Sequence, residues 1–277
     1  MNGFIPKAVV SGSFDNLGYQ DVRLLEEAAK FGSLHVFLWS DGLVRTLDGN
    51  YPMFPLEERE YLIRGIRYVN RVYVVNRLPD RDALSNFDEY GSTTWVVSEA
   101  NNNAAKRLFC ASYGLKYHVV KQMSLKTFPI PQSKNGRAIP QSKKVVVTGC
   151  YDWFHSGHLR FFEEASALGD LYVLVGSDEN VRLLKGEGHP MFPQGERRYL
   201  VQSISFVKHA LISSGSGWMD AEPEIAQIKP DFYVVNEDGD VPEKRKFCED
   251  REIGYVVLKR TPKEGLPRRQ STDLRGF

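Results

Sequence analysis

The chain has 277 residues, of which 42% are hydrophobic and 26% are charged, and its formal net charge at pH 7 is +1. This length suits two domains, each with its own core, and the small net charge argues against a general nucleic-acid binder or a protein that binds membrane surfaces through basic residues. Three cysteines, Cys110, Cys150 and Cys248, are too few for a disulfide framework and do not have the spacing of metal ligands.

The predicted elements begin close to the amino terminus. The apolar run Ala8–Val10 predicts a strand, and Val22–Lys30 predicts a helix. Residues 1–7 leave little room for a signal peptide, and no stretch approaches the roughly 18 apolar residues of a membrane span, so we expect a cytoplasmic protein. The segment Lys121–Lys144 contains three prolines and a glycine, which predicts a linker without a regular helix or central strand.

The second half contains the most informative stretch. Val145–Val147 predicts a strand, a polar loop with His155 and His158 follows, and the next apolar residues have the spacing of one helix face before a second strand at Leu171–Val175. A strand, helix, strand unit of this kind favours a parallel sheet, which binds ligands beyond the carboxyl ends of its strands. His158 falls in the first helical turn, where free N–H groups favour an anion. The loop therefore predicts a phosphate site.

The two halves of the chain resemble each other. Residues 8–39 align with residues 145–176 at an offset of 137, and after a one-residue gap the offset becomes 138, so that both copies contain the sequence Pro-Met-Phe-Pro. Self-similarity at a fixed period indicates a repeated structural unit. We therefore predict two tandem Rossmann-like α/β domains, each a parallel sheet flanked by helices, with residues 1–140 as the first domain with its linker and residues 141–277 as the second.

The copies differ at the positions expected to hold phosphate. The second copy has His155, His158 and Lys185, which favour a phosphate through positive charge and hydrogen bonds. The residues at these positions in the first copy are Gly18, Asp21 and Asp48. We expect the first copy to be inactive and to have kept its fold as a scaffold.

The run Gly149–His158 resembles the G-x-F-D-x-x-H-x-G-H signature of the cytidylyltransferase-like nucleotidyltransferases, with Tyr151 in place of the usual phenylalanine. The resemblance continues through later motifs and covers nearly all of residues 143–277. It implies that a substrate phosphate attacks the α-phosphorus of a nucleoside triphosphate and that pyrophosphate leaves. The tandem layout resembles that of ethanolamine-phosphate cytidylyltransferase, in which the degraded copy follows the working one.

The resemblance also implies roles for individual residues. His155, His158 and Lys185 are expected to contact the triphosphate as catalytic groups. The residues expected to bind the nucleotide are Gly149, Cys150, Tyr151, Asp152, Gly157, Arg197, Asn236, Asp238, Ser271 and Thr272. Arg197 would face the nucleotide or hold the loop beside it. The candidates for contacts with the acceptor are Trp153, Trp218 and Arg269, although aromatic residues are also typical of packing.

Three functions fit these motifs. We favour transfer from CTP to a phosphorylated alcohol or sugar. The alternative is an ATP-dependent adenylyltransferase acting on a sugar phosphate, because Leu183–Arg197 is similar to bacterial sugar-phosphate enzymes of the ADP-heptose synthase type. The third is a non-catalytic nucleotide-binding scaffold.

Mg²⁺ is expected to accompany the triphosphate, without a dedicated metal site in the protein. In family members that are homodimers, the segment similar to Arg67–Asn70 lies at the subunit contact. We therefore expect a monomer in which this segment and Ser205–Lys208 form an internal pseudo-dimer.

Overall fold

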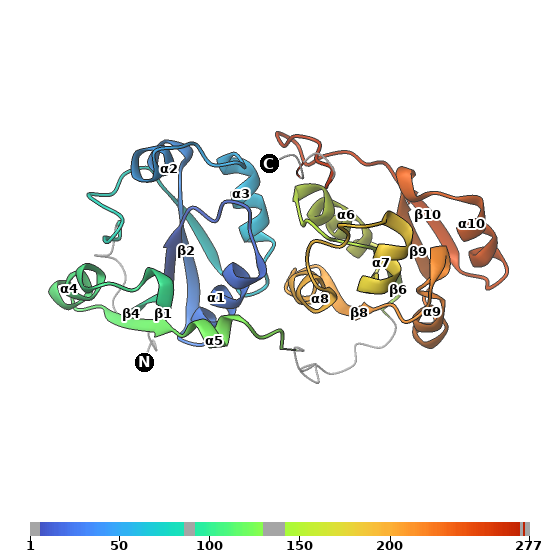
Figure 1. Ribbon diagram of the computed structural model, residues 1–277, viewed down its shortest axis with the longest axis horizontal. Coiled ribbons are helices and arrows are strands. Elements are labelled where there is room, and N and C mark those ends of the chain that lie inside the picture. Colours follow the sequence, from blue (N-terminus) through green and yellow to red (C-terminus); the bar gives the residue numbers. More distant parts are fainter. Residues whose placement is uncertain (1–5, 86–91, 130–141, 272–273, 275–277) are drawn as a thin grey trace. The chain divides into compact units, whose positions relative to one another are not determined.

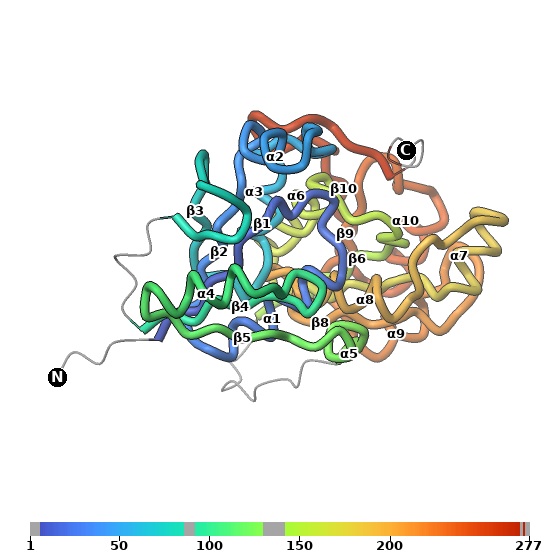
Figure 2. The backbone as a smooth tube through the Cα atoms, turned by 60° about the vertical axis from the view of Figure 1, so that its left-hand side comes forward, coloured from blue at the N-terminus to red at the C-terminus, as the bar shows by residue number. Residues whose placement is uncertain are grey.

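The computed structural model describes residues 6–85, 92–129, 142–271 and 274, and by its internal contacts the chain divides into two compact units, Met1–Thr127 and Phe128–Phe277. Figures 1 and 2 follow the chain from the first unit, coloured blue to green, into the second, coloured yellow-green to red. The domain boundary predicted near residue 140 lies outside the described residues.

The first unit contains a five-stranded parallel sheet with the strand order β3-β2-β1-β4-β5. Its strands are β1 (Lys7–Gly12), β2 (Ser33–Trp39), β3 (Arg71–Val75), β4 (Thr93–Ser98) and β5 (Lys116–Val120). Its helices are α1 (Tyr19–Ala29), α2 (Asp41–Asp48), α3 (Leu56–Arg64), α4 (Ala104–Ser112) and the single turn α5 (Gln122–Leu125).

The second unit repeats this topology in a parallel sheet with the order β10-β9-β6-β7-β8. Its strands are β6 (Lys144–Gly149), β7 (Asp170–Val175), β8 (Val207–Ile212), β9 (Phe232–Asn236) and β10 (Gly254–Leu258). Its helices are α6 (Ser156–Ser166), α7 (Asp178–Lys185), α8 (Gln194–Gln202), α9 (Glu222–Ile228) and α10 (Pro242–Glu249). The predicted fold, two Rossmann-like domains in tandem, is confirmed.

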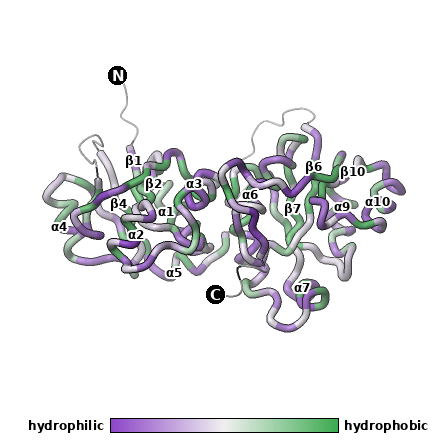
Figure 3. Tube along the Cα trace, turned by 90° about the horizontal axis from the view of Figure 1, so that it is seen from above, coloured by the Kyte–Doolittle hydropathy of each residue, from purple (hydrophilic) through white to green (hydrophobic). Residues whose placement is uncertain are grey.

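The central strands are apolar because a parallel sheet covered on both faces has no solvent side. In β6, Val145, Val146 and Val147 are fully buried, and the neighbouring β7 is equally hydrophobic, as its green colour in Figure 3 shows. From β6 the chain adds β7 and β8 on one side of the sheet. It then crosses over, so that β9 lies on the other side of β6. The carboxyl ends of β6 and β9 therefore form the switch point at which such sheets bind ligands.

One expected element differs in the structure. The segment predicted to lack a regular helix begins with the single turn α5, because its prolines come later and do not oppose helical geometry there. Among the described residues, no helix combines the length and apolarity that a membrane crossing requires.

Candidate functional site

A pocket with a cavity volume of about 190 Å³ opens at the switch point of the second sheet. Most of the residues predicted from sequence line it together, although they come from four separate segments. These residues are Gly149, Cys150, Tyr151, Asp152, His155, Gly157, His158, Lys185, Asn236, Asp238 and Ser271. Thr272 lies outside the described residues.

The start of α6 fixes the first histidine. His155 is the N-cap residue, and its Nδ1 accepts a hydrogen bond from the Gly157 amide at 3.1 Å. A neutral imidazole that accepts at Nδ1 has its proton on Nε2. A Cβ at Gly157 would approach this ring to 3.0 Å, so a glycine suits the close packing of the cap.

The second histidine stacks on the first. The ring centroids of His155 and His158 are 3.9 Å apart and the planes differ by 19°. His158 also contacts the rings of Tyr151 and Phe154, at 5.3 and 5.5 Å. These aromatic neighbours remove water from one side of the pair.

Both imidazoles are neutral at pH 7 in this structure. Burial, followed by the nearby Arg260 and Arg269, lowers the pKa of His155 to about 3. Burial and the His155 ring hold the pKa of His158 well below its usual value. The histidines therefore offer hydrogen bonds, not the positive charge that the sequence suggested.

Each imidazole has one buried nitrogen without a hydrogen-bond partner among the described residues, Nε2 of His155 and Nδ1 of His158. His155 is only 1% exposed. A buried polar atom without a partner costs about 1–3 kcal/mol. A ligand oxygen in the pocket would remove this cost, so the two atoms indicate a polar ligand.

Tyr151 shapes the wall behind the histidines. It has a left-handed backbone (φ 53°), and its ring lies over Gly149, where a Cβ would come within 2.7 Å of the ring. Position 149 therefore requires glycine. The next residue, Cys150, has a thiol pKa that burial raises, which does not favour a thiolate nucleophile.

Asp152 holds a neighbouring loop. Its Oδ1 accepts from the amides of Met191 and Phe192 at 2.7 and 3.0 Å. In the first copy Asp15 accepts from the equivalent amides of the Pro-Met-Phe-Pro loop. Since both copies keep this contact, it belongs to the fold rather than to the chemistry.

Arg197 does not line the pocket. Its side chain is 1% exposed and donates to the carbonyls of Cys150, Gly176 and Phe192 at 2.6–2.9 Å, and to Asp178 at 2.8 Å. Of the two roles that the sequence left open for Arg197, the geometry is that of a residue that holds the loops.

Among the lining residues that sequence reasoning did not select, three have basic side chains: His189, Lys244 and Arg260. Arg260 follows β10 at the same edge of the sheet, and the first copy has Gln122 at the equivalent position, so a comparison of the copies contained this signal. Lys244 matches Lys106 in the first copy, so such a comparison would pass over it.

The pocket combines free and paired charges. Among the described residues, Lys185 at the end of α7 pairs with no carboxylate, and Arg260 pairs with Asp238. Lys244 donates to the Gly239 carbonyl at 3.2 Å. Among these cations, the ammonium of Lys185 is therefore the most available to bind a phosphate.

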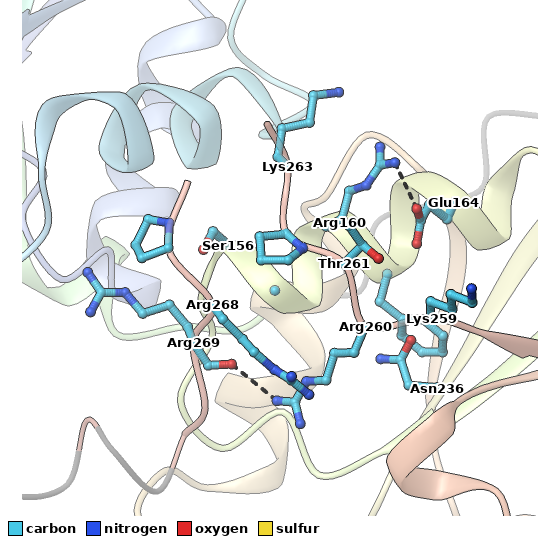
Figure 4. A pocket seen from close by; sticks show the side chains of 14 residues that line it. Ser156, Arg160, Glu164, Asn236, Lys259, Arg260, Thr261, Lys263, Arg268 and Arg269 are labelled. Carbon is cyan, nitrogen blue, oxygen red and sulfur yellow. Dashed lines mark hydrogen bonds and ion pairs between the residues drawn. The ribbon is translucent and has the colours of Figure 1, made fainter. Parts of the chain in front are cut away.

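A second, much smaller pocket, with a cavity volume of about 20 Å³, adjoins the first (Figure 4). Gly157, Asn236 and Arg260 line both. In Figure 4, Arg260 donates to the Arg269 carbonyl at 3.2 Å, whereas the Arg269 side chain extends away from it. Arg160, although cationic, pairs with two glutamates of its own helix, so part of the positive charge here is already neutralised.

The predicted aromatic contacts lie outside both pockets. Trp153 packs edge to face on Phe192, with centroids 6.1 Å apart. Trp218 is 72% exposed, and Asn180 holds the turn before it by two hydrogen bonds to Gly217. The Ser271 hydroxyl, in the larger pocket, donates to the Trp153 carbonyl at 3.3 Å.

In the first unit, a side chain of the helix itself occupies the equivalent helix start. The Gly18 amide donates to Asp21 Oδ2 at 3.0 Å, and burial raises the pKa of this carboxyl. Asp48, in the place of Lys185, pairs with Arg81 at 2.8 Å. A carboxyl therefore stands where the second copy has an imidazole, and the inactivity of the first copy stays a prediction.

No cluster of three or more His, Cys, Asp or Glu side chains suited to a metal ion occurs within the described ranges. Two carboxylates line the larger pocket, and both already have partners. Asp152 accepts hydrogen bonds from backbone amides, and Asp238 forms an ion pair with Arg260. Mg²⁺ keeps several waters and binds largely through substrate phosphates in many enzymes, so this residue set is compatible with an ion that arrives with a nucleotide.

The fold is that of an α/β protein with a doubly wound parallel sheet, and the pocket lies at its switch point. A family model described as Cytidylyltransferase-like matches residues 146–260. The chain is 36% identical over 125 residues to the FAD synthase of Ferroglobus placidus, covering 44% of this chain and 78% of that protein. It is 32% identical over 134 residues to the FAD synthase of Methanospirillum hungatei, covering 47% and 82%.

The chain is also 29% identical over 143 residues to the bifunctional protein HldE of Helicobacter pylori (strain P12). That alignment covers 49% of this chain and 30% of HldE, so the chain spans less than a third of that relative. On these matches, the chain belongs to the cytidylyltransferase-like family of nucleotidyltransferases.

Proposed function

We propose that the second unit transfers the nucleotidyl group of a nucleoside triphosphate to a phosphorylated small molecule. An oxygen of the acceptor phosphate forms a bond to the α-phosphorus, the bond from the α-phosphorus to the bridging oxygen breaks, and pyrophosphate leaves with that electron pair. The acceptor phosphate is already an anion near neutral pH, since its second pKa is about 6. The reaction therefore needs no strong general base.

The observation that carries this proposal is the pair of stacked imidazoles, each with a buried unpartnered nitrogen, at the first turn of α6. Donors fixed before the reaction stabilise charge as it develops on phosphoryl oxygens. The Nε2–H of His155 is such a donor, and Lys185 supplies positive charge from across the pocket. Mg²⁺ bound to the triphosphate would neutralise further charge on the leaving pyrophosphate.

We place the triphosphate in the larger pocket and the nucleoside over Gly157, toward the adjoining pocket. Gly157, Phe161, Asn236 and Arg260 form the shared wall, and the absence of a side chain at position 157 leaves room for a ring between the two pockets. Asn236 and Asp238 remain our candidates for contacts with the base or ribose. Asp238 is already held by Arg260, so Asn236 is the better candidate.

For the nucleotide we favour ATP over the CTP that the sequence suggested. Two of the relatives are named FAD synthase, and FAD carries an adenylyl group. CTP stays the second candidate, because the matching family model is described as Cytidylyltransferase-like. For the acceptor we favour a sugar phosphate, on the similarity of Leu183–Arg197 to sugar-phosphate enzymes.

The test is pyrophosphate release measured for ATP and CTP, each with pools of sugar phosphates, phosphorylated alcohols and FMN, in the presence of Mg²⁺. The proposal predicts pyrophosphate release that requires both a nucleotide and an acceptor. The ratio of the release rates with ATP and with CTP decides between the two candidate nucleotides. Nucleotide binding without release under every acceptor would instead support a non-catalytic scaffold and refute the proposal.

A further inference from the structure

The two copies use the same aspartate differently. In the first copy both carboxylate oxygens of Asp15 accept hydrogen bonds from backbone amides, Oδ2 from Met53 and Oδ1 from Phe54. In the second copy both equivalent amides share Oδ1 of Asp152. The other oxygen, Oδ2, lies 3.8 Å from Nδ1 of His189.

The residue that meets this oxygen also differs between the copies. His189 lines the catalytic pocket together with Lys185, and its side chain is 19% exposed. At the equivalent position the first copy has Tyr51, which is 62% exposed and whose hydroxyl pairs with Arg45 at 2.6 Å. An imidazole turned into the pocket thus occurs in the copy that has the other phosphate-binding side chains.

We propose that His189 is a third catalytic imidazole, which contacts the β- and γ-phosphates of the nucleotide and stabilises the departing pyrophosphate. This inference rests on the proposed function and extends its site. Asp152 acts as a positioning residue. Its Oδ2 lies 3.8 Å from Nδ1 of His189 and orients the ring toward the phosphates of a bound nucleotide.

The division of labour follows from the surroundings of each ring. His155 and His158 are stacked on one another among aromatic side chains, away from any carboxylate that pairs with them among the described residues. His189 has the Asp152 carboxylate 3.8 Å from its Nδ1 and lines the pocket together with Lys185. It therefore adds a hydrogen-bonding side chain to the lining that carries the Lys185 ammonium.

The first experiment compares His189→Ala with His189→Gln by pyrophosphate release, with Tyr51→Ala as the matched variant in the first copy. Loss of a donor aimed at developing charge predicts a kcat about 10²-fold lower for His189→Ala, with a smaller change in KM for the nucleotide. His189→Gln keeps an N–H donor and should recover part of this loss, and Tyr51→Ala should turn over like the wild type. A kcat of His189→Ala within twofold of wild type would overturn the inference, as would an equal loss in His189→Gln.

The second experiment does not depend on turnover. Binding of inorganic pyrophosphate, measured by calorimetry, should weaken about tenfold in His189→Ala, a loss of about 1.4 kcal/mol. Asp152→Asn keeps an oxygen for the two loop amides and replaces the one that faces His189, so it should weaken pyrophosphate binding in the same direction. Equal affinity in wild type and His189→Ala would refute the role of His189, whereas the proposed function is tested separately by wild-type turnover.

Discussion

Replacement of Arg197 by alanine tests the reading of this residue as a structural clamp. The change would leave the carbonyls of Cys150, Gly176 and Phe192 without their donor, in a region from which water is largely excluded. At about 1 kcal/mol or more for each unsatisfied acceptor, these three groups account for at least about 3 kcal/mol. The ion pair with Asp178 adds little, because that carboxylate is partly exposed. We therefore expect the second unit to lose about 3 kcal/mol of stability or somewhat more, almost all of it from the three carbonyls.

The first unit provides the matched control. Arg59 is fully buried there and makes the same set of contacts, with the carbonyls of Ser13, Trp39 and Phe54 and with Asp41. Arg59→Ala should destabilise the first unit by a similar amount. Hydrogen exchange in low urea, followed separately in β6 and β7 and in β1 and β2, measures each loss in its own unit. A loss below about 1 kcal/mol for Arg197→Ala would refute the clamp.

Two further predictions concern the loop and the pH dependence. Gly149→Ala forces a Cβ to within 2.7 Å of the Tyr151 ring, and we expect the free energy of unfolding in urea to fall by about 1–3 kcal/mol. As the control, the Cβ of Gly12→Ala would meet Phe14 at an ordinary 3.5 Å, so this change should be tolerated. Equal losses in the two variants would contradict the packing argument. The lowered pKa of His155, about 3 against 6.5 when unfolded, means that the unfolded chain binds the proton first as pH falls below about 6.5. As the pH falls from 7 to 5, this group should lower the free energy of unfolding by about 2 kcal/mol, and His155→Gln should remove that part of the pH dependence. If the difference in unfolding free energy between pH 7 and pH 5 were the same in His155→Gln as in the wild type, the ring would not be held neutral.

Much of the fold could be predicted from the sequence. The apolar run at Val145–Val147 and the spacing of the following helix placed the strand, loop and helix unit, and the internal repeat then supplied the second copy of the same sheet. The loop with His155 and His158 could be placed at the carboxyl edge of the sheet, because parallel strands all end there. Local pattern and repeat were sufficient for this level of detail.

Individual roles in the site depended on burial, which sequence does not display. Arg197 has the same charge whether it faces a nucleotide or three carbonyls, and only the packing around it distinguishes these cases. The neutral state of His155 likewise follows from its surroundings. His189 was missed because it belongs to a different loop and reaches the pocket only through the chain path after α7.

The central claim is that the two imidazoles of the second unit act on a nucleoside triphosphate, and the most direct measurement is pyrophosphate release by His155→Ala, by His158→Ala and by the double variant. We expect each single change to lower kcat by roughly 10²- to 10³-fold, the usual cost of one preorganised donor. Asp21→Ala, at the equivalent position of the first copy, should keep the wild-type rate. A folded double variant that releases pyrophosphate as fast as the wild type would contradict the claim.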